Sequence, residues 1–138
     1  MTRYMEIAQT IWQQLLMNKW GIMAWGIESR FGQKDVEAIC SPNGDIYSHP
    51  ALGTLRLLVN NTAVGRKAWV YISLNGMDTY DILIFRKKTT RKEALTPAYA
   101  ELTHKYENIY FDEMFEVIDN ALIGKDAPMK FNPKPELN

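Results

Sequence analysis

The chain has 138 residues, of which 46% are hydrophobic and 23% charged. These values are typical of one soluble globular domain. Its 16 basic residues balance its 16 acidic ones, which excludes a strong global field that would steer the protein toward nucleic acid or an anionic membrane. Any electrostatic partner must therefore bind a local patch.

Cellular location is constrained by cysteine use and hydropathy. The single cysteine, Cys40, excludes an intrachain disulfide and fits a reducing compartment. The N-terminal sequence lacks the order of a signal peptide, and no apolar run approaches the roughly 18 residues that span a bilayer. We expect a cytoplasmic, soluble protein that has no membrane partner.

The first third of the chain predicts a helix, a strand and a hairpin. Apolar residues recur every three or four positions from Tyr4 to Asn18, the period of an amphipathic helix. Two glycines and two tryptophans between Trp20 and Phe31 favour a strand, with the tryptophans packed against that helix rather than forming a ligand platform. The turn sequence SPNGD, residues 41–45, predicts a short hairpin of VEAIC and IYSHP. A short helix over KDVEAI is the alternative.

The segment from Leu52 to Arg86 predicts three consecutive strands joined by two tight turns. If the turn at Asn75-Gly76 holds two or four residues, even positions of the middle strand oppose odd positions of the next strand. If the turn at 60–65 has the same parity, the side chains of all three strands divide between two faces. The first is an aliphatic core of Leu55, Leu57, Val59, Ala68, Val70, Ile72, Leu74, Leu83 and Phe85, with Asp81 near its end. The second is an aromatic and aliphatic face with a basic margin, formed by Arg56, Leu58, Lys67, Trp69, Tyr71, Tyr80, Ile82, Ile84 and Arg86.

Two helices are predicted after the meander and a basic run that follows it, formed by Arg86, Lys87, Lys88, Arg91 and Lys92. Thr96-Pro97 is a favourable helix start and leads into a short helix over 97–105. A second helical stripe begins near Asp112, and Gly124 lies just past its end. We therefore expect one α+β domain over 1–125: an N-terminal helix, an antiparallel meander sheet of about four to six strands and two C-terminal helices. An extended or disordered tail is expected over 126–138.

Catalytic and metal motifs are not recognisable in the sequence. Cys40, Asp45 and His49 lack the ligand spacing of a zinc site. No nucleophile signature and no glycine-rich phosphate loop occurs. We predict no metal and no cofactor.

Paired carboxylates offer a weak enzymatic alternative. Asp78 and Asp81 flank Tyr80 at the start of the third meander strand, where two acids and a tyrosine could perform acid–base chemistry. However, turn chemistry already explains Asp78, and the two acids point to opposite faces if both lie in the strand. We therefore predict no catalytic residue.

The second sheet face is the candidate functional surface. Apolar sheet faces are most often covered by a helix or a partner subunit, which favours a non-enzymatic protein-interaction module that self-associates as a homo-oligomer. Aromatics with a basic rim also match a single-stranded nucleic-acid surface, which is the alternative. A small-molecule or enzymatic cleft is the third hypothesis. The candidate residues are Arg56, Lys67, Trp69, Tyr71, Tyr80, Ile82, Ile84 and Arg86.

The segment GRKAWVYISLNGMDTYDILIF resembles small uncharacterised proteins carried by phages and integrative genetic elements. In these proteins a helix precedes a strand meander that has a similar LNG-x-D-x-YD turn. The resemblance covers about the first two-thirds of the chain. It implies a mobile-element origin and brings no activity to any residue.

Overall fold

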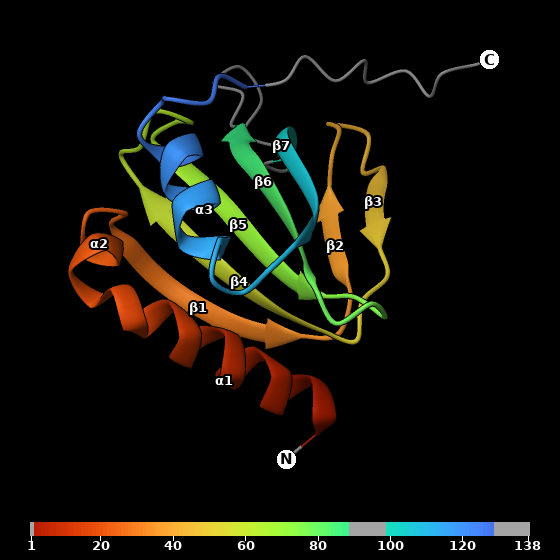
Figure 1. Cartoon of the computed structure of the whole chain (residues 1–138). Coiled ribbons are helices and arrows are strands. Elements are labelled where there is room, and N and C mark those ends of the chain that lie inside the picture. The colour runs from red at the N-terminus through yellow and green to blue at the C-terminus, as the bar shows by residue number, and fades with distance from the viewer. Residues whose placement is uncertain (1, 89–98, 129–138) are drawn as a thin grey trace.

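The computed structural model describes residues 2–88 and 99–128 (Figure 1). The elements in chain order are α1 (Arg3–Leu15), the 3₁₀ turn η1 (Leu16–Asn18), α2 (Lys19–Met23), β1 (Ile27–Gln33), β2 (Val36–Ile39), β3 (Ile46–His49), β4 (Gly53–Asn60), β5 (Lys67–Leu74), β6 (Tyr80–Lys88), β7 (Tyr99–Ile109) and α3 (Met114–Leu122). Five strands form an antiparallel sheet in the order β1-β4-β5-β6-β7. The strands β2 and β3 form a separate hairpin. The α+β class is confirmed.

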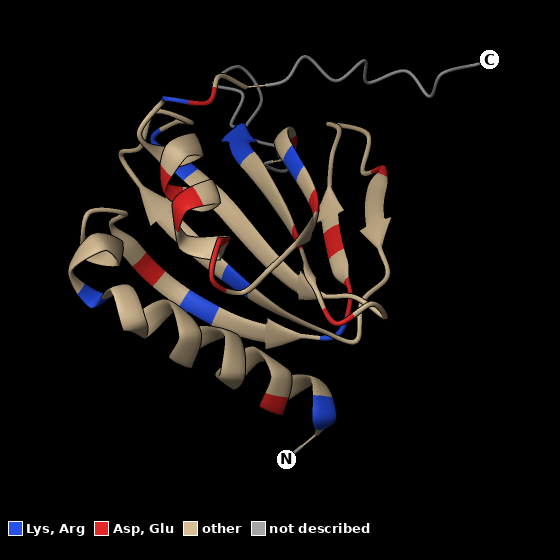
Figure 2. Ribbon diagram, viewed as in Figure 1, with Lys and Arg blue, Asp and Glu red and all other residues tan. Residues whose placement is uncertain are grey.

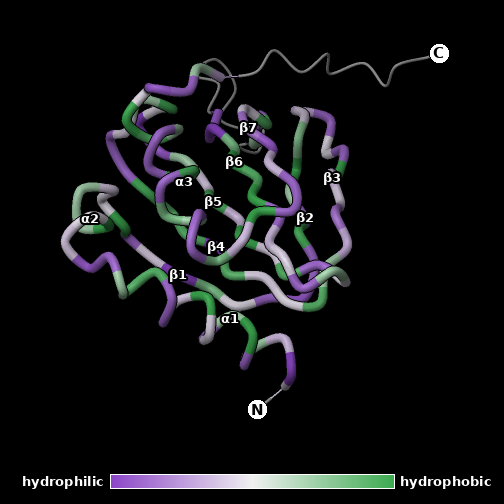
Figure 3. Tube along the Cα trace, in the orientation of Figure 1, coloured by the Kyte–Doolittle hydropathy of each residue, from purple (hydrophilic) through white to green (hydrophobic). Residues whose placement is uncertain are grey.

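The main core lies between the helices and the first face of the sheet. Buried side chains at a helical period, Ile7, Ile11 and Leu15, place α1 against this face. The α3 residues Met114 and Ile118 join the same core. Figure 3 shows green, hydrophobic stretches along the strands that these helices cover. The amphipathic helix predicted at the N-terminus is confirmed. In the described part of the chain, no helix combines the length and apolarity needed to cross a membrane.

The hairpin of β2 and β3 covers part of the second sheet face. Val36 and Ala38 turn inward from β2 and pack in a second core with Tyr71 and Leu83. The Phe85 ring meets Tyr47 and Tyr71 edge to face, at centroid distances of 5.8 and 5.3 Å. The hairpin predicted around SPNGD is therefore confirmed. Its role, which the sequence did not indicate, is to bury the aromatic side of the sheet.

The strand predicted from Trp20 to Phe31 is wrong in its first half. Residues Lys19–Met23 form α2, and β1 begins only at Ile27. Gly26 makes the corner between them with a φ of +65°, and a side chain there would sit 2.8 Å from the Asn60 carbonyl oxygen. Glycine therefore ends the helix here instead of continuing a strand.

The predicted helix over 97–105 is also wrong over 99–105, the part that the structure describes. Residues from Tyr99 onward belong to β7, which pairs with β6 along its length. Without β7, the buried strand β6 would leave its backbone groups unpaired, and this outweighs local helix preference. The Thr96-Pro97 start, with Arg91 and Lys92 of the basic run, falls outside the described residues, as does the predicted tail from 129 onward. The second helix is confirmed as α3, and Gly124 follows it at a φ of +88°.

Close approach of α1 to β4 requires a glycine at position 53. A methyl group added to Gly53 would lie 2.7 Å from Cβ of Ile7, below any normal contact. We expect Gly53→Ala to lower the free energy of unfolding by about 1–2 kcal/mol, because α1 must move off the sheet. Gly76→Ala is the matched control, since nothing lies within 4 Å of its added methyl. Equal urea midpoints for the two variants would contradict this packing.

Candidate functional site

The turn between β5 and β6 decides which side chains share the second face. It runs from 75 to 79, an odd number of residues, and not the two or four expected. Even positions therefore oppose even positions: Leu74 pairs with Tyr80, and Val70 with Ile84. Directly opposed residues of an antiparallel pair point to the same face. The predicted assignment of every β6 side chain to its face was therefore wrong.

The longer turn is organised by the side chain of Asn75. Its Oδ1 accepts hydrogen bonds from the backbone N–H groups of Met77 and Thr79, at 2.9 and 3.2 Å. The Asn75 N–H donates to the Thr79 carbonyl at 3.0 Å, and Asp78 adopts a φ of +62°. Because the Asn75 side chain bonds backbone groups further along the chain, the turn closes with five residues instead of four. Asn-Gly alone does not specify this turn length.

Four predicted site residues consequently lie on the helix-covered face. Ile82 and Ile84 are buried in the main core. The Tyr80 hydroxyl donates to Oε1 of Gln14 on α1 at 2.7 Å, and Nε of Arg86 donates to the Val64 carbonyl at 2.6 Å. Conversely, Asp81, Leu83 and Phe85 move to the second face. The side chains of the first four residues, which lie on the helix-covered face, therefore cannot contribute to a site on the second face.

The other predicted site residues do come together, on β4 and β5. Arg56 pairs with Tyr71, and Leu58 with Trp69. The guanidinium carbon of Arg56 lies 4.6 Å from the ring centroid of Phe31, on β1, and 4.8 Å from that of Trp69. Such stacking on two aromatic rings holds an arginine by cation–π attraction.

Lys67 lies at the margin of this group. Its Nζ is 3.0 Å from Oε1 of Glu28 in a half-exposed ion pair. Exposed pairs of this kind contribute little to stability. Lys67 therefore already has a counter-ion, whereas Arg56 has none within residues 2–88 and 99–128.

A cleft of about 340 Å³ opens between β2 and the sheet beside Arg56. It is lined by Glu37, Ala38, Ile39, Arg56, Trp69, Tyr71, Lys87, Tyr99 and Ala100. The sequence could not place the β2 and β7 residues here, because both strands reach the cleft only through the tertiary fold. Phe31 was missed because no local pattern shows that β1 pairs with β4. We call this hollow the Arg56 cleft.

Arg56 is the electrostatically unusual residue of the cleft. Its Nε is buried and has no hydrogen-bond partner, the one side-chain nitrogen or oxygen in the described residues of which this is true. None of the ion pairs among these residues includes Arg56. A desolvated donor without an acceptor costs stability, and more so when it is charged. The cleft therefore contains one buried donor that has no acceptor among the described residues.

Tyr71 forms the floor of the cleft and is neutral at physiological pH. Its side chain is buried, with 2% exposed. Burial raises the pKa of the Tyr71 hydroxyl, and the nearby Arg56 charge offsets this only in part. The hydroxyl donates to the Glu37 carbonyl at 3.3 Å, which ties β2 to the sheet. Tyr71 thus holds the cleft in shape and supplies no anion to Arg56.

A part-buried pair of an aspartate and a histidine lies at the other end of the hairpin. Oδ2 of Asp81 is 2.8 Å from Nε2 of His49, and Oδ1 accepts from Nδ2 of Asn75 at 3.0 Å and from the Asn108 N–H at 3.1 Å. Burial by itself raises the pKa of Asp81, but these hydrogen bonds together hold it below its usual range. The nearby Ser73 is fully buried and bonds Thr54, so it cannot act as a nucleophile. The pair joins the hairpin to the sheet.

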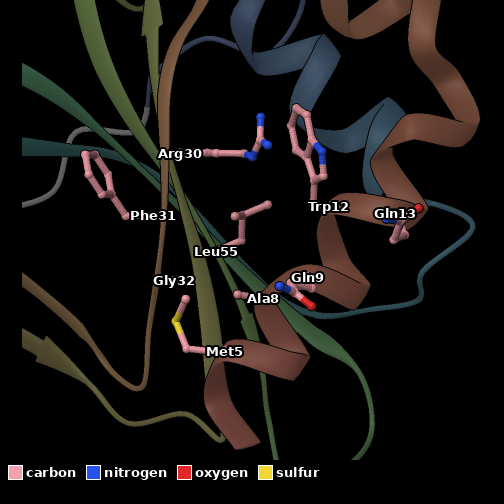
Figure 4. Close-up of a pocket in the computed structure, with 9 residues that line it drawn as sticks. All are labelled: Met5, Ala8, Gln9, Trp12, Gln13, Arg30, Phe31, Gly32 and Leu55. Carbon is pink, nitrogen blue, oxygen red and sulfur yellow. The ribbon is translucent and has the colours of Figure 1, made fainter. Parts of the chain in front are cut away.

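A larger hollow, of about 450 Å³, lies between α1 and β1 on the opposite face. Figure 4 shows Arg30 and Trp12 facing each other there, while Phe31 points away to the other side of β1. The Arg30 guanidinium carbon is 4.6 Å from the Trp12 ring centroid. No buried polar atom lining this hollow lacks a partner. It therefore shows less demand for a ligand than the Arg56 cleft.

Charge and ligand chemistry elsewhere in the described residues do not indicate another centre. Figure 2 shows acidic and basic positions interspersed along the elements. Within 2–88 and 99–128, no three His, Cys, Asp or Glu side chains gather as metal ligands. Comparisons with protein-family models, with curated proteins and with solved structures find no match for this chain.

Proposed function

We propose that the protein is a non-enzymatic protein-interaction module that binds an acidic segment of a partner protein in the Arg56 cleft. The observation that supports this is the Arg56 guanidinium, which is stacked between two aromatic rings and has a buried Nε without an acceptor. A carboxylate of the partner supplies a counter-ion for this guanidinium. Lys87, at the same cleft, adds a second positive charge.

Arginine is suited to this role because its planar donors match the two oxygens of a carboxylate. Its two stacking partners fix the guanidinium plane before a ligand arrives, so that little rotamer entropy is lost on binding. The apolar walls of Ile39, Ala100 and Trp69 lower the local dielectric and strengthen the contact. The expected ligand is therefore one Asp or Glu side chain with short apolar flanks.

Single-stranded nucleic acid is less favoured by the same contacts. Base stacking needs free aromatic faces. In the cleft, Arg56 lies over Phe31 and over one side of Trp69, while Tyr71 and Phe85 are buried beneath the hairpin.

A titration with a fluorescently labelled oligo-glutamate peptide tests the proposal. We expect Arg56→Gln to weaken binding about 10-fold or more, because the removed charge leaves the partner carboxylate without its paired donors. The matched control is Arg30→Gln, which removes an arginine stacked on Trp12 on the opposite face. Binding should fall as salt concentration rises.

Three outcomes would count against the proposal. Equal binding of oligo-glutamate and oligo-glutamine excludes a carboxylate ligand. Equal losses in Arg56→Gln and Arg30→Gln exclude the cleft as its site. Salt-dependent binding of a single-stranded oligonucleotide that Arg56→Gln abolishes, with no binding of the acidic peptide, replaces the proposed partner with nucleic acid.

A further inference from the structure

The wall that β2 contributes to the Arg56 cleft is the backbone edge of the strand. Three consecutive residues of β2, Glu37, Ala38 and Ile39, line the cleft. Side chains of a strand alternate between its two faces, and Ala38 packs inward against the sheet. Three residues in a row can therefore border one hollow only where the edge of the strand faces it.

The hydrogen bonds of the hairpin determine which backbone groups lie on that edge. The Cys40 N–H donates to the Asp45 carbonyl at 2.8 Å, so this pair is bonded across the hairpin. The next pair along the hairpin is Ile39 with Ile46. Because bonded and non-bonded pairs alternate between antiparallel strands, the backbone groups of Ile39 and Glu37 point away from β3.

One of these groups already reaches the floor of the cleft. The Glu37 carbonyl accepts from the Tyr71 hydroxyl at 3.3 Å, so this edge faces the sheet. The N–H and carbonyl of Ile39 have no hydrogen-bond partner within residues 2–88 and 99–128, where β2 pairs with β3 alone. Ile39 is 42% exposed, so a ligand can reach the edge at this residue. An unpaired strand edge is a template for another strand.

We infer that the acidic segment of the partner binds as an extended strand, which pairs with the free edge of β2 and directs one carboxylate to Arg56. This inference rests on the proposed function and specifies the backbone conformation of the ligand. Main-chain hydrogen bonds to the edge supply affinity, and the alternating side chains of an extended segment supply specificity. One acidic side chain therefore faces the cleft, while its two neighbours in the ligand face away.

Charge complementarity at this edge selects an acidic strand. Arg56 and Lys87 both line the cleft, and none of the ion pairs among the described residues includes either of them. A carboxylate on the added strand meets both positive charges. Complementary charge of this kind fixes the register in which two surfaces meet.

A helical ligand and the edge of β1 are both less suitable. The backbone groups of a helix bond one another, so a helix cannot pair with the edge of β2. The register of β1 shifts between Ile27 and Ser29, and this strand carries the charged residues Glu28 and Arg30. Bulges and charges on an edge strand discourage pairing with another strand.

A fluorescence titration with a labelled Val-Thr-Glu-Thr-Val peptide, blocked at both ends, tests this inference on the full chain. The contact between its single glutamate and Arg56 fixes the register. N-methylation of one backbone nitrogen at a time removes single donors from the peptide. Because every second N–H of an added strand faces β2, binding should weaken by about 5- to 10-fold at alternate positions and change little between them.

Ile39→Pro tests the same contact from the side of the protein. Proline removes the N–H on the cleft edge of β2, so this variant should bind the unmodified peptide about 5- to 10-fold more weakly. Ile46→Pro is the matched control, because Ile46 lies opposite Ile39 and its N–H points to the outer edge of β3. Free strand edges tolerate proline, and circular dichroism measures the folding of both variants. If Ile39→Pro does not fold, the N-methylated peptides still test the inference on the wild-type chain.

Failure of this inference and failure of the proposed function give different results. N-methyl effects that do not alternate overturn the inference, as does equal binding by folded Ile39→Pro and Ile46→Pro. If the peptide then still requires both its carboxylate and Arg56, the proposed function stands and the segment binds in another conformation. If Val-Thr-Gln-Thr-Val binds as well as the acidic peptide and Arg56→Gln changes nothing, the proposed function fails. No binding by any of the peptides contradicts both.

Discussion

Replacing Trp25 with alanine should lower the free energy of unfolding by about 3–5 kcal/mol, as large-to-small changes of a fully buried aromatic do. Trp25 is 1% exposed and belongs to the main core. It stacks on Phe115 and bonds Asp119, so it joins the end of α2 to α3. Alanine at this position creates a cavity and leaves Asp119 without that donor.

The other tryptophan of the same segment provides the control. Trp20 lies five residues earlier but is 80% exposed, so Trp20→Ala should change stability by no more than about 0.5 kcal/mol in dilute protein. Urea denaturation followed by circular dichroism measures both variants. Similar losses for the two tryptophans would mean that α2 is packed differently.

Replacing Asp81 with alanine should cost about 3 kcal/mol, because it removes the acceptor of three part-buried hydrogen bonds and one half of an ion pair. The carboxylate accepts from Asn75 and from the Asn108 N–H, and it pairs with His49 at 2.8 Å. These contacts join β3, the turn after β5 and the end of β7. Asp81→Asn keeps the shape of the side chain and should cost less.

The same residue predicts a pH dependence of stability. The folded-state pKa of Asp81 is lowered, below the value near 3.9 in an unfolded chain. The unfolded state therefore binds the proton more tightly than the folded state. Asp81 contributes stability above about pH 4, and this contribution is lost as pH falls through the folded pKa.

Urea midpoints measured between neutral and strongly acidic pH test this dependence. The wild type should lose more stability on acidification than Asp81→Asn, because the variant has no proton to bind at this site. A double-mutant cycle with His49→Gln gives the coupling between the two side chains. Parallel pH curves for wild type and Asp81→Asn would contradict the assigned role of the carboxylate.

Local sequence patterns predicted the elements that depend on local interactions. The amphipathic period from Tyr4 set α1, the turn residues 41–45 set the hairpin, and the stripe ending before Gly124 set α3. Alternation also placed Leu55, Leu57 and Val59 with Ala68, Val70 and Ile72 on one face. In each of these, the chain's own periodicity or turn chemistry carries the information.

Elements that depend on distant partners were not predictable in this way. β7 is a strand because β6 requires a partner, although Thr96-Pro97 favours a helix start. The α2 helix packs Gly21 against Phe115, which is far away in sequence. Tertiary pairing outweighs local propensity at both positions.

The candidate site also contains some residues that local patterns predicted and others whose positions depend on tertiary structure. The sequence identified Arg56, Trp69 and Tyr71 as an unusual group because adjacent strands of fixed register bring them together. It misplaced Tyr80, Ile82, Ile84 and Arg86, since one extra turn residue moves every following side chain to the other face. Only the tertiary structure determined that the hairpin covers part of the aromatic face and leaves the Arg56 cleft open, because no local pattern encodes where a hairpin packs.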